Sequence, residues 1–213
     1  ELPELIRLAD AAGARIVGLH AHSGSGIRTP DAWPSLARLL ARLAADLPNV
    51  RHLDVGGGLG VPEKQGQRDL DLRLVDESLA AVLRPRPDLE LWIEPGRYLV
   101  AAAGVLLAHV TQRKRKGDVR FVGVNVGMNT LIRPALYGAY HEIRNLSRLG
   151  EPAVEVANVV GPICESGDTL GHERPLPRSE EGDVLLIANA GAYGRAMSSE
   201  YNLRAPAGER VLP

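Results

Sequence analysis

The 213-residue sequence predicts an α/β region followed by a region of antiparallel β structure. Three predicted strands begin at residues 15, 51 and 89, so their starts are 36 and 38 residues apart. This spacing is typical of βα units with parallel strands and right-handed crossovers. After Arg97 the pattern changes to short apolar or alternating runs separated by turns that contain Gly, Pro or Asp. We therefore expect the boundary near residues 97–104, with domains at 1–100 and 101–213.

The first region alternates strands and helices. Strands are predicted over 15–20, 51–55 and 89–93, and helices over 32–47 and near 72–83. Asp31 is placed to cap the first of these helices. In the second region the predicted strands cover 100–110, 119–126, 153–160 and 184–187. Three βα units cannot close an eight-stranded barrel, because at about 37 residues a unit the other five would need about 185 residues more. A three-stranded sheet with exposed edges is the alternative.

Composition narrows the class of protein. Hydrophobic residues make up 45% of the sequence and charged residues 24%, as in ordinary globular proteins. The net charge of −1 gives no electrostatic reason to expect nucleic acid or an anionic membrane. The basic run Arg113–Lys116 leads into Gly117 and Asp118, and we interpret it as a solvated turn. No apolar run reaches the ~18 residues of a membrane span. The single cysteine excludes an internal disulfide framework and favours the cytoplasm.

A short motif follows each predicted strand of the first region. These motifs are HSGS at 22–25, GGG at 56–58 and EPGR at 94–97. Ligand-binding residues gather at such strand ends in α/β folds. Together the motifs offer what pyridoxal phosphate (PLP) requires: a flat ring partner, donors for its phosphate and a carboxylate for its pyridine nitrogen. Each motif also has an ordinary explanation, such as a salt bridge between Glu94 and Arg97.

Lysines and histidines limit the possible chemistry. The only lysines are Lys64, Lys114 and Lys116, and none is placed where a Schiff-base lysine is expected. His20 and His22 form an HxH pair of the kind that begins some metal sites in barrel hydrolases. That alternative needs further histidines at later strand ends, and the sequence does not supply them. We therefore predict no metal.

The second region contains three candidate segments. The run 161–168 places Cys164, Glu165 and Asp168 in one turn, although a lone cysteine is more often buried filler. Arg133 stands among apolar residues, which suits either a buried carboxylate partner or an internal ion pair. Tyr193 lies in a turn flanked by glycines.

In combination the motifs resemble the fold-type III, alanine-racemase-like PLP decarboxylases. The matching runs are GLHAHSGS (18–25), LDVGGGLG (53–60), EPGRY (94–98), GMN (127–129), LIRPALYGAYH (131–141), CESGD (164–168) and GAY (191–193). The fifth and sixth runs favour the diaminopimelate branch over ornithine or arginine decarboxylases. Two runs depart from the family's common forms, because NVGMN replaces DAGMN at 125–129 and HSGSG replaces HIGSQ at 22–26. The sequence of residues 123–150 also resembles that of fused aspartate kinase–decarboxylases.

The resemblance implies a fold and a reaction. The chain would be the last three βα units of a PLP-binding (β/α)8 barrel followed by a C-terminal antiparallel β domain. Because the sequence starts within a helix-like pattern, we expect it to be a piece of a longer protein. The half of the family's proteins that carries the Schiff-base lysine would then be absent, and this piece would be inactive alone. The complete protein would decarboxylate meso-2,6-diaminopimelate to L-lysine and carbon dioxide, in lysine biosynthesis. The alternatives are a PLP decarboxylase of another diamino acid or polyamine precursor, or a non-catalytic fragment that only dimerises.

The resemblance also implies roles for single residues. A head-to-tail homodimer with shared active sites would bring Cys164, the proton donor, and Glu165 into the partner's site. The cofactor residues would be His22 on the ring, Glu94 at the pyridine nitrogen, and Ser25, Gly56, Gly57, Gly58, Arg97 and Tyr193 at the phosphate. The substrate residues would be Arg133 and Tyr137 at carboxylate groups, with Glu165 and Tyr193.

Overall fold

The computed structural model describes residues 1–212, which form two compact units. The first unit comprises residues 1–61 and 68–98, and the second comprises residues 62–67 and those from 99 onward. Within the described residues, no helix is long and apolar enough to cross a membrane.

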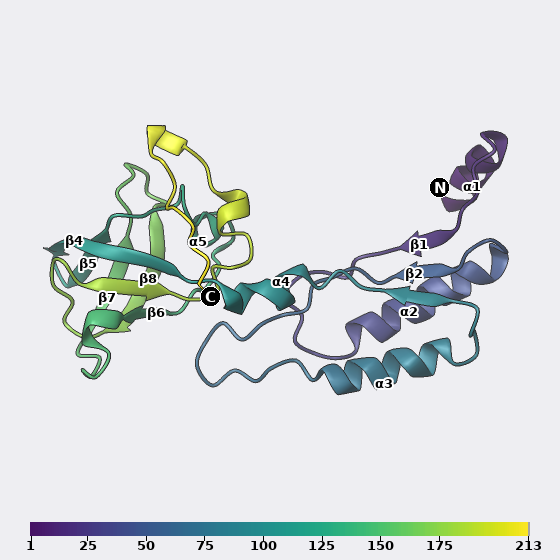
Figure 1. Ribbon diagram of the computed structural model, residues 1–213, viewed down its shortest axis with the longest axis horizontal. Helices are drawn as coiled ribbons and strands as arrows, with labels where there is room; N and C mark the ends of the chain where they lie inside the picture. Colours follow the sequence, from purple (N-terminus) through teal and green to yellow (C-terminus); the bar gives the residue numbers. More distant parts are fainter. Residues whose placement is uncertain (213) are drawn as a thin grey trace. The chain divides into compact units, whose positions relative to one another are not determined.

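The first unit is a parallel three-stranded sheet with helices α2 and α3 on one face (Figure 1). The strand order is β1-β2-β3, and Leu19, Leu53 and Leu91 lie at one level across it. This arrangement confirms the expected βα repeat, with strands shorter than predicted. The elements are α1 (Leu2–Ala11), β1 (Gly18–His20), α2 (Ala32–Leu43), η1 (Ala44–Asp46), β2 (His52–Asp54), α3 (Leu72–Leu83) and β3 (Glu90–Trp92).

The core of this unit lies between the sheet and its helices. Leu53 of β2 and Trp33 of α2 are almost completely buried there. Because side chains alternate along a strand, the residues on either side of Leu53 point to the other face. On that face the His52 and Trp92 rings lie 4.6 Å apart, and Trp92 is 51% exposed. The sheet therefore packs against its helices on the Leu53 face, while the opposite face carries His52, Asp54 and Trp92.

The two long helices of the unit begin differently. Asp71 caps α3, since its carboxylate accepts hydrogen bonds from the N–H groups of Arg73 and Leu74. Asp31 occupies the N-cap position of α2 as predicted. Its side chain, however, makes no capping hydrogen bond within the described part of the chain, because its own backbone is already helical.

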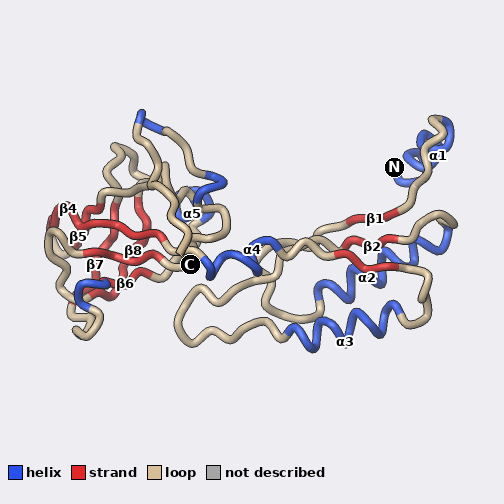
Figure 2. Tube along the Cα trace, in the orientation of Figure 1, coloured by secondary structure: helices blue, strands red, loops and turns tan. Residues whose placement is uncertain are grey.

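The second unit is built on a six-stranded sheet (Figure 2). The strand order is β6-β9-β4-β5-β7-β8, and every neighbouring pair is antiparallel except β5 and β7. The expected antiparallel β domain is thus confirmed, with one parallel pair. Helix α4 (Gly96–Val100) begins in the first unit and ends in the second. The other elements are η2 (Ala101–Ala103), β4 (Leu106–Lys116), β5 (Val119–Val124), α5 (Arg133–Tyr137), β6 (Ile143–Asn145), η3 (Leu146–Arg148), β7 (Glu155–Val160), β8 (Thr169–Leu176), β9 (Val184–Ile187), η4 (Arg195–Met197) and η5 (Tyr201–Leu203).

Some strand predictions in this unit were wrong. Residues 100–103 are helical, so the strand predicted over 100–110 begins only at Leu106. Strands β6 and β8 were not predicted at all. β6 has only three residues, and β8 carries His172, Glu173, Arg174 and Pro175, which hide the apolar alternation of a strand.

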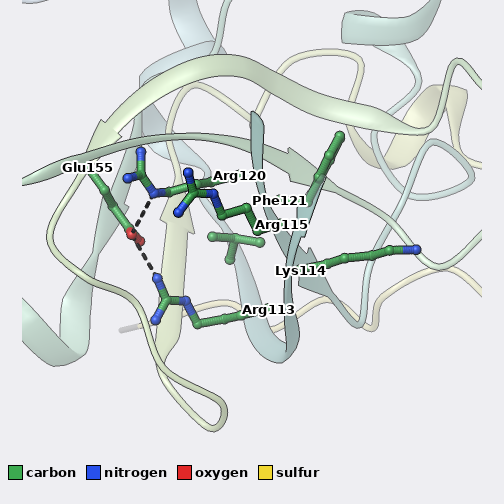
Figure 3. A pocket seen from close by; sticks show the side chains of 7 residues that line it. Arg113, Lys114, Arg115, Arg120, Phe121 and Glu155 are labelled. Carbon is green, nitrogen blue, oxygen red and sulfur yellow. Dashed lines mark hydrogen bonds and ion pairs between the residues drawn. The ribbon is translucent and has the colours of Figure 1, made fainter. Parts of the chain in front are cut away.

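The basic run Arg113–Lys116 is the end of strand β4 rather than a turn, which corrects the interpretation from sequence. Figure 3 shows Arg113 and Arg120 directed toward Glu155 from neighbouring strands. The Arg113 guanidinium lies 2.7 Å from Glu155 and 3.3 Å from Glu180. These side chains line a pocket of about 220 Å³. Ion pairs with Glu155 and Glu180 therefore balance much of the positive charge of the arginines that line this pocket.

Candidate active site

The cofactor motifs of the first unit meet at the carboxyl ends of its three strands. His22 follows β1, the glycine run follows β2 and Glu94 follows β3. The Gly57 N–H donates to His22 Nδ1 at 3.2 Å, so two of the motifs are directly bonded. Since Nδ1 accepts this bond, a neutral His22 carries its proton on Nε2.

Three side chains hold the glycine run in place. Gly56 N–H donates to Asp54 Oδ1 at 2.9 Å, Gly57 N–H donates to His22, and the buried Trp33 indole donates to the Gly57 carbonyl at 2.9 Å. The backbone donors of Gly56 and Gly57, expected to bind phosphate, are therefore already engaged within the chain. Phosphate contact by this run would fall to Gly58.

Glycine is required here by space and by backbone conformation. Gly56 has φ +68° and Gly58 has φ +84°, in the left-handed region that disfavours other residues. A Cβ on Gly57 would collide with the Glu94 carbonyl, and one on Gly58 with the Gly24 carbonyl. The three strand-end loops thus come so close that there is no room for a Cβ at Gly57 or Gly58.

Arg97 and Ser25 form a donor pair suited to an anion. Arg97 Nη2 donates to Ser25 Oγ at 2.9 Å, although the two residues are 72 positions apart in the sequence. A guanidinium and a hydroxyl at this separation can both donate to one phosphate. Glu94 itself forms an ion pair with His20.

Glu94 lies beside His20 and Asp54. His20 Nε2 is 3.5 Å from Glu94 Oε2, and both side chains are more than half exposed. Possible ligand atoms of the three residues lie within 4.8 Å of one another. The HxH pair itself diverges, since His20 faces Glu94 while His22 faces Gly57. This divergence argues against the HxH metal site of a barrel hydrolase.

The candidate substrate residues lie in the second unit. Arg133 begins α5 and is only 6% exposed. Its Nη1 donates to His141 Nε2 at 3.1 Å. Tyr137, one turn further along α5, is 64% exposed. The buried guanidinium and the exposed phenol therefore stand on the same short helix.

The loop containing Cys164 is built around a buried carboxylate. Asp168 is 3% exposed and accepts hydrogen bonds from the N–H groups of Met128 at 2.6 Å and Ile163 at 2.7 Å. A Cβ on Gly167 would contact Ala135 of α5 at 3.8 Å. Asp168 thus ties the 125–131 segment to the Cys164 loop, and Gly167 places that loop beside the helix of Arg133.

Cys164 and Glu165 are exposed and contact the C-terminal segment. The Tyr201 hydroxyl donates to Glu165 Oε1 at 2.6 Å, and this bond raises the pKa of Tyr201 above its usual value. The Asn202 amide lies 3.8 Å from Cys164 Sγ. Asn129 holds this segment, because its Nδ2 donates to the Arg204 carbonyl at 2.9 Å.

Tyr193 and the lysines complete the predicted set. Tyr193 is 45% exposed with φ +61°, in a turn anchored by the bond from Ala190 N–H to the Gly104 carbonyl at 2.8 Å. Lys64 lies with its ammonium 4.9 Å from the Tyr140 ring centroid, and the other two lysines are in β4. Lys64 lies in the loop between β2 and α3, and within the described residues no lysine lies in the three motifs that follow β1, β2 and β3.

Sequence reasoning assigned no role to Trp33, Asp54 or His141, and it noticed Asp168 without finding that it anchors the Cys164 loop. Trp33 and Asp54 hold the glycine run, His141 contacts Arg133, and Asp168 shapes the Cys164 loop. All but Trp33 lie within the motifs, and their role depends on contacts that spacing alone does not show.

The fold and these residues describe an α/β unit with a guanidinium–hydroxyl pair after its strands, followed in the chain by a β unit. The family model described as "Pyridoxal-dependent decarboxylase, C-terminal sheet domain" matches residues 37–191, more than half of the chain. The chain therefore belongs to the pyridoxal-dependent decarboxylase family.

Individual relatives agree with this assignment. The chain is 41% identical over 218 residues to the diaminopimelate decarboxylase of Methanothermobacter thermautotrophicus, covering 96% of this chain and 50% of that protein. The structure of diaminopimelate decarboxylase from Helicobacter pylori complexed with L-lysine matches with a TM-score of 0.84 at 35% identity, over 93% of this chain and 50% of that one. The structure of SrLDC in complex with PLP and cadaverine matches with a TM-score of 0.85 at 25% identity, over 96% and 54%. The chain thus spans about half the length of the relatives it matches.

Proposed function

We propose that the complete gene product is a PLP-dependent decarboxylase that converts meso-2,6-diaminopimelate to L-lysine and carbon dioxide. The observation that carries this proposal is the joining of three strand-end motifs around Gly57, with the Arg97–Ser25 pair beside them. A hydroxyl, a guanidinium, a glycine backbone, an imidazole and a carboxylate form the donor set that the phosphate and ring of PLP require.

Each cofactor residue has a defined task in this proposal. When bound, PLP would supply an electron sink for the carbon that loses carbon dioxide. His22 would cover the ring with its orientation set by Gly57. Glu94 would hold a proton at the pyridine nitrogen, while Ser25, Gly58, Arg97 and Tyr193 would hold the phosphate.

The substrate residues account for the choice of amino acid. Arg133 would bind a substrate carboxylate, assisted by Tyr137, and Glu165 would bind the distal amino-acid end together with Tyr193. Cys164 would return a proton to the carbon that has lost carbon dioxide. We assign His22, Ser25, Gly58, Glu94 and Arg97 to a domain at 1–100. Arg133, Cys164, Glu165 and Tyr193 belong to a domain at 101–213, and the protein is cytoplasmic.

A homodimer with shared sites is part of the proposal. Its support is that Cys164 and Glu165 are exposed although the loop that carries them is anchored by Asp168. Co-expression tests it: a subunit with Cys164→Ala is paired with one carrying Arg97→Ala. Shared sites regenerate one intact site per mixed dimer, so activity should partly return. No recovery in a confirmed mixed dimer would place both groups in one subunit's site.

A second candidate is decarboxylation of another diamino acid, favoured by the likeness to SrLDC with bound cadaverine. The test is to supply the complete gene product and PLP with diaminopimelate, lysine or ornithine and to measure carbon dioxide and the amine product. We expect L-lysine from diaminopimelate at the highest kcat/KM. Faster release of cadaverine from lysine would favour the second candidate.

A further inference from the structure

His141 is a buried link between Arg133 and the central sheet of the second unit. Its side chain is completely buried, with Nε2 3.1 Å from Arg133 Nη1 and Nδ1 2.8 Å from the Ala188 carbonyl oxygen. Ala188 directly follows β9, and its N–H donates to the Glu142 carbonyl at 2.9 Å. The imidazole therefore connects the guanidinium to the end of a sheet strand.

The partners of His141 determine where its proton lies. A guanidinium can only donate hydrogen bonds, and a carbonyl oxygen can only accept them. Nε2 must therefore carry a lone pair toward Arg133, and Nδ1 must carry the proton toward Ala188. His141 is thus a neutral imidazole in a single tautomer, since a proton on Nε2 would face the guanidinium.

We propose that His141 is a positioning residue that fixes the Arg133 guanidinium for a substrate carboxylate. This inference rests on the proposed function. Bidentate binding of a carboxylate requires the plane of the guanidinium to be fixed. Arg133 begins a helix of five residues. The acceptor at His141 Nε2 holds its guanidinium from the end of a sheet strand.

Two amide substitutions separate this role from simple filling of the core. In His141→Gln the side-chain oxygen can reach the Nε2 position and accept from Arg133. In His141→Asn the side-chain N–H can reach the Nδ1 position and donate to Ala188, but the acceptor for Arg133 is lost. Both variants place an amide at the same buried site, so each is the other's matched control.

The experiment measures kcat and KM for diaminopimelate, and melting temperature, in the complete holoenzyme. We expect His141→Asn to lower kcat/KM about ten- to a hundredfold, by analogy with the loss of a residue that orients a metal ligand. We expect His141→Gln to retain most of the kcat/KM at a similar melting temperature. Once Arg133 is replaced by alanine, His141→Asn should lower kcat/KM no further.

Three outcomes would overturn the positioning role. The first two are equal kcat/KM in the two variants and a greater loss of kcat/KM in His141→Gln. The third is that His141→Asn lowers kcat/KM as much in the Arg133→Ala background as in the wild type. A wild-type enzyme that does not decarboxylate diaminopimelate would instead overturn the proposed function.

In that case, crystal structures of the two variants test the positioning role without any activity measurement. The Arg133 guanidinium should keep its place in His141→Gln and leave it in His141→Asn, and an unmoved guanidinium in both would refute the inference.

Discussion

Gly57 and His22 are joined by a hydrogen bond from the backbone N–H of the glycine to Nδ1 of the imidazole, at 3.2 Å. The bond connects the loop after β2 to the loop after β1. Because Nδ1 accepts this bond, a neutral His22 carries its proton on Nε2. The bond also gives the Gly57 N–H an acceptor. A cofactor ring covered by His22 would thus depend on a glycine 35 residues away.

Gly57→Ala should abolish the cofactor site. The added Cβ would collide with the Glu94 carbonyl, so the β2 and β3 loops would have to separate and the His22 bond would break. We expect a stability loss of about 1–3 kcal/mol and at least a tenfold weaker affinity for PLP. Denaturant unfolding and PLP absorbance titration measure the two effects. Gly150→Ala is the control, because its Cβ would meet nothing within 4 Å; equal PLP affinity in both variants would contradict the assignment.

Glu94→Ala should damage turnover far more than folding. The Glu94 side chain is 56% exposed, so its removal should change stability by no more than about 0.5 kcal/mol. Losing the group that holds a proton at the pyridine nitrogen should lower kcat by about a hundredfold or more. Steady-state kinetics and a melting curve of the complete enzyme test both. The assigned role fails if kcat stays near normal in Glu94→Ala.

The regular parts of the first unit could be predicted because local signals and packing agree there. The period of the apolar residues placed α2 and α3 nearly correctly, and turn residues marked the strand ends. Asp31 shows the limit, since its position was predicted but its capping bond was not formed. A cap depends on backbone angles just before the helix, which sequence spacing does not determine.

Contacts across long sequence separations could not be predicted. The motifs identified Arg133 and Glu94, but not that His141 would bond the first or His20 approach the second. Strand β8 was missed because its charged residues and Pro175 obscure the alternation. Arg113 was misassigned to a turn because its partners, Glu155 and Glu180, are 42 and 67 positions away.

The turn before β9 should make stability depend on acid pH through Asp183. Its carboxylate is mostly buried, which raises its pKa, but hydrogen bonds from Glu180 N–H, Asn145 and Arg148 outweigh burial and lower the pKa overall. A lowered pKa in the folded state stabilises the protein above the unfolded value of about 3.9. That contribution is lost as pH falls through the folded pKa.

Asp183→Asn should therefore lose about 1.5–3 kcal/mol of stability at pH 7, the range for hydrogen bonds to a charged group. Its difference from wild type should shrink as the pH falls from 5 toward 3. Urea unfolding across this range measures the difference, with Asp118→Asn, whose side chain is fully exposed, as the control. A difference that stays constant with pH would show that the charge of Asp183 is not the cause.

Arg133 should select a substrate that carries a carboxylate where its guanidinium lies. Because Arg133 is 6% exposed, a carboxylate that binds it loses water, and removing one member of such a buried pair costs roughly 3–5 kcal/mol. Arg133→Ala should therefore lower kcat/KM for diaminopimelate by about two to three powers of ten or more. Arg133→Lys should recover little of the loss, since an ammonium cannot reproduce the planar fork of donors.

The competing explanation for Arg133 is structural, with its bond to His141 serving only the core. In that case Arg133→Ala would lower the melting temperature and leave the order of preference among diaminopimelate, ornithine and lysine unchanged. Measuring melting temperature and kcat/KM for the three substrates separates the explanations, with Arg144→Ala as a control on an exposed arginine whose partner is Glu142. Recognition predicts that the preference for diaminopimelate collapses in Arg133→Ala, remains collapsed in Arg133→Lys and is intact in Arg144→Ala.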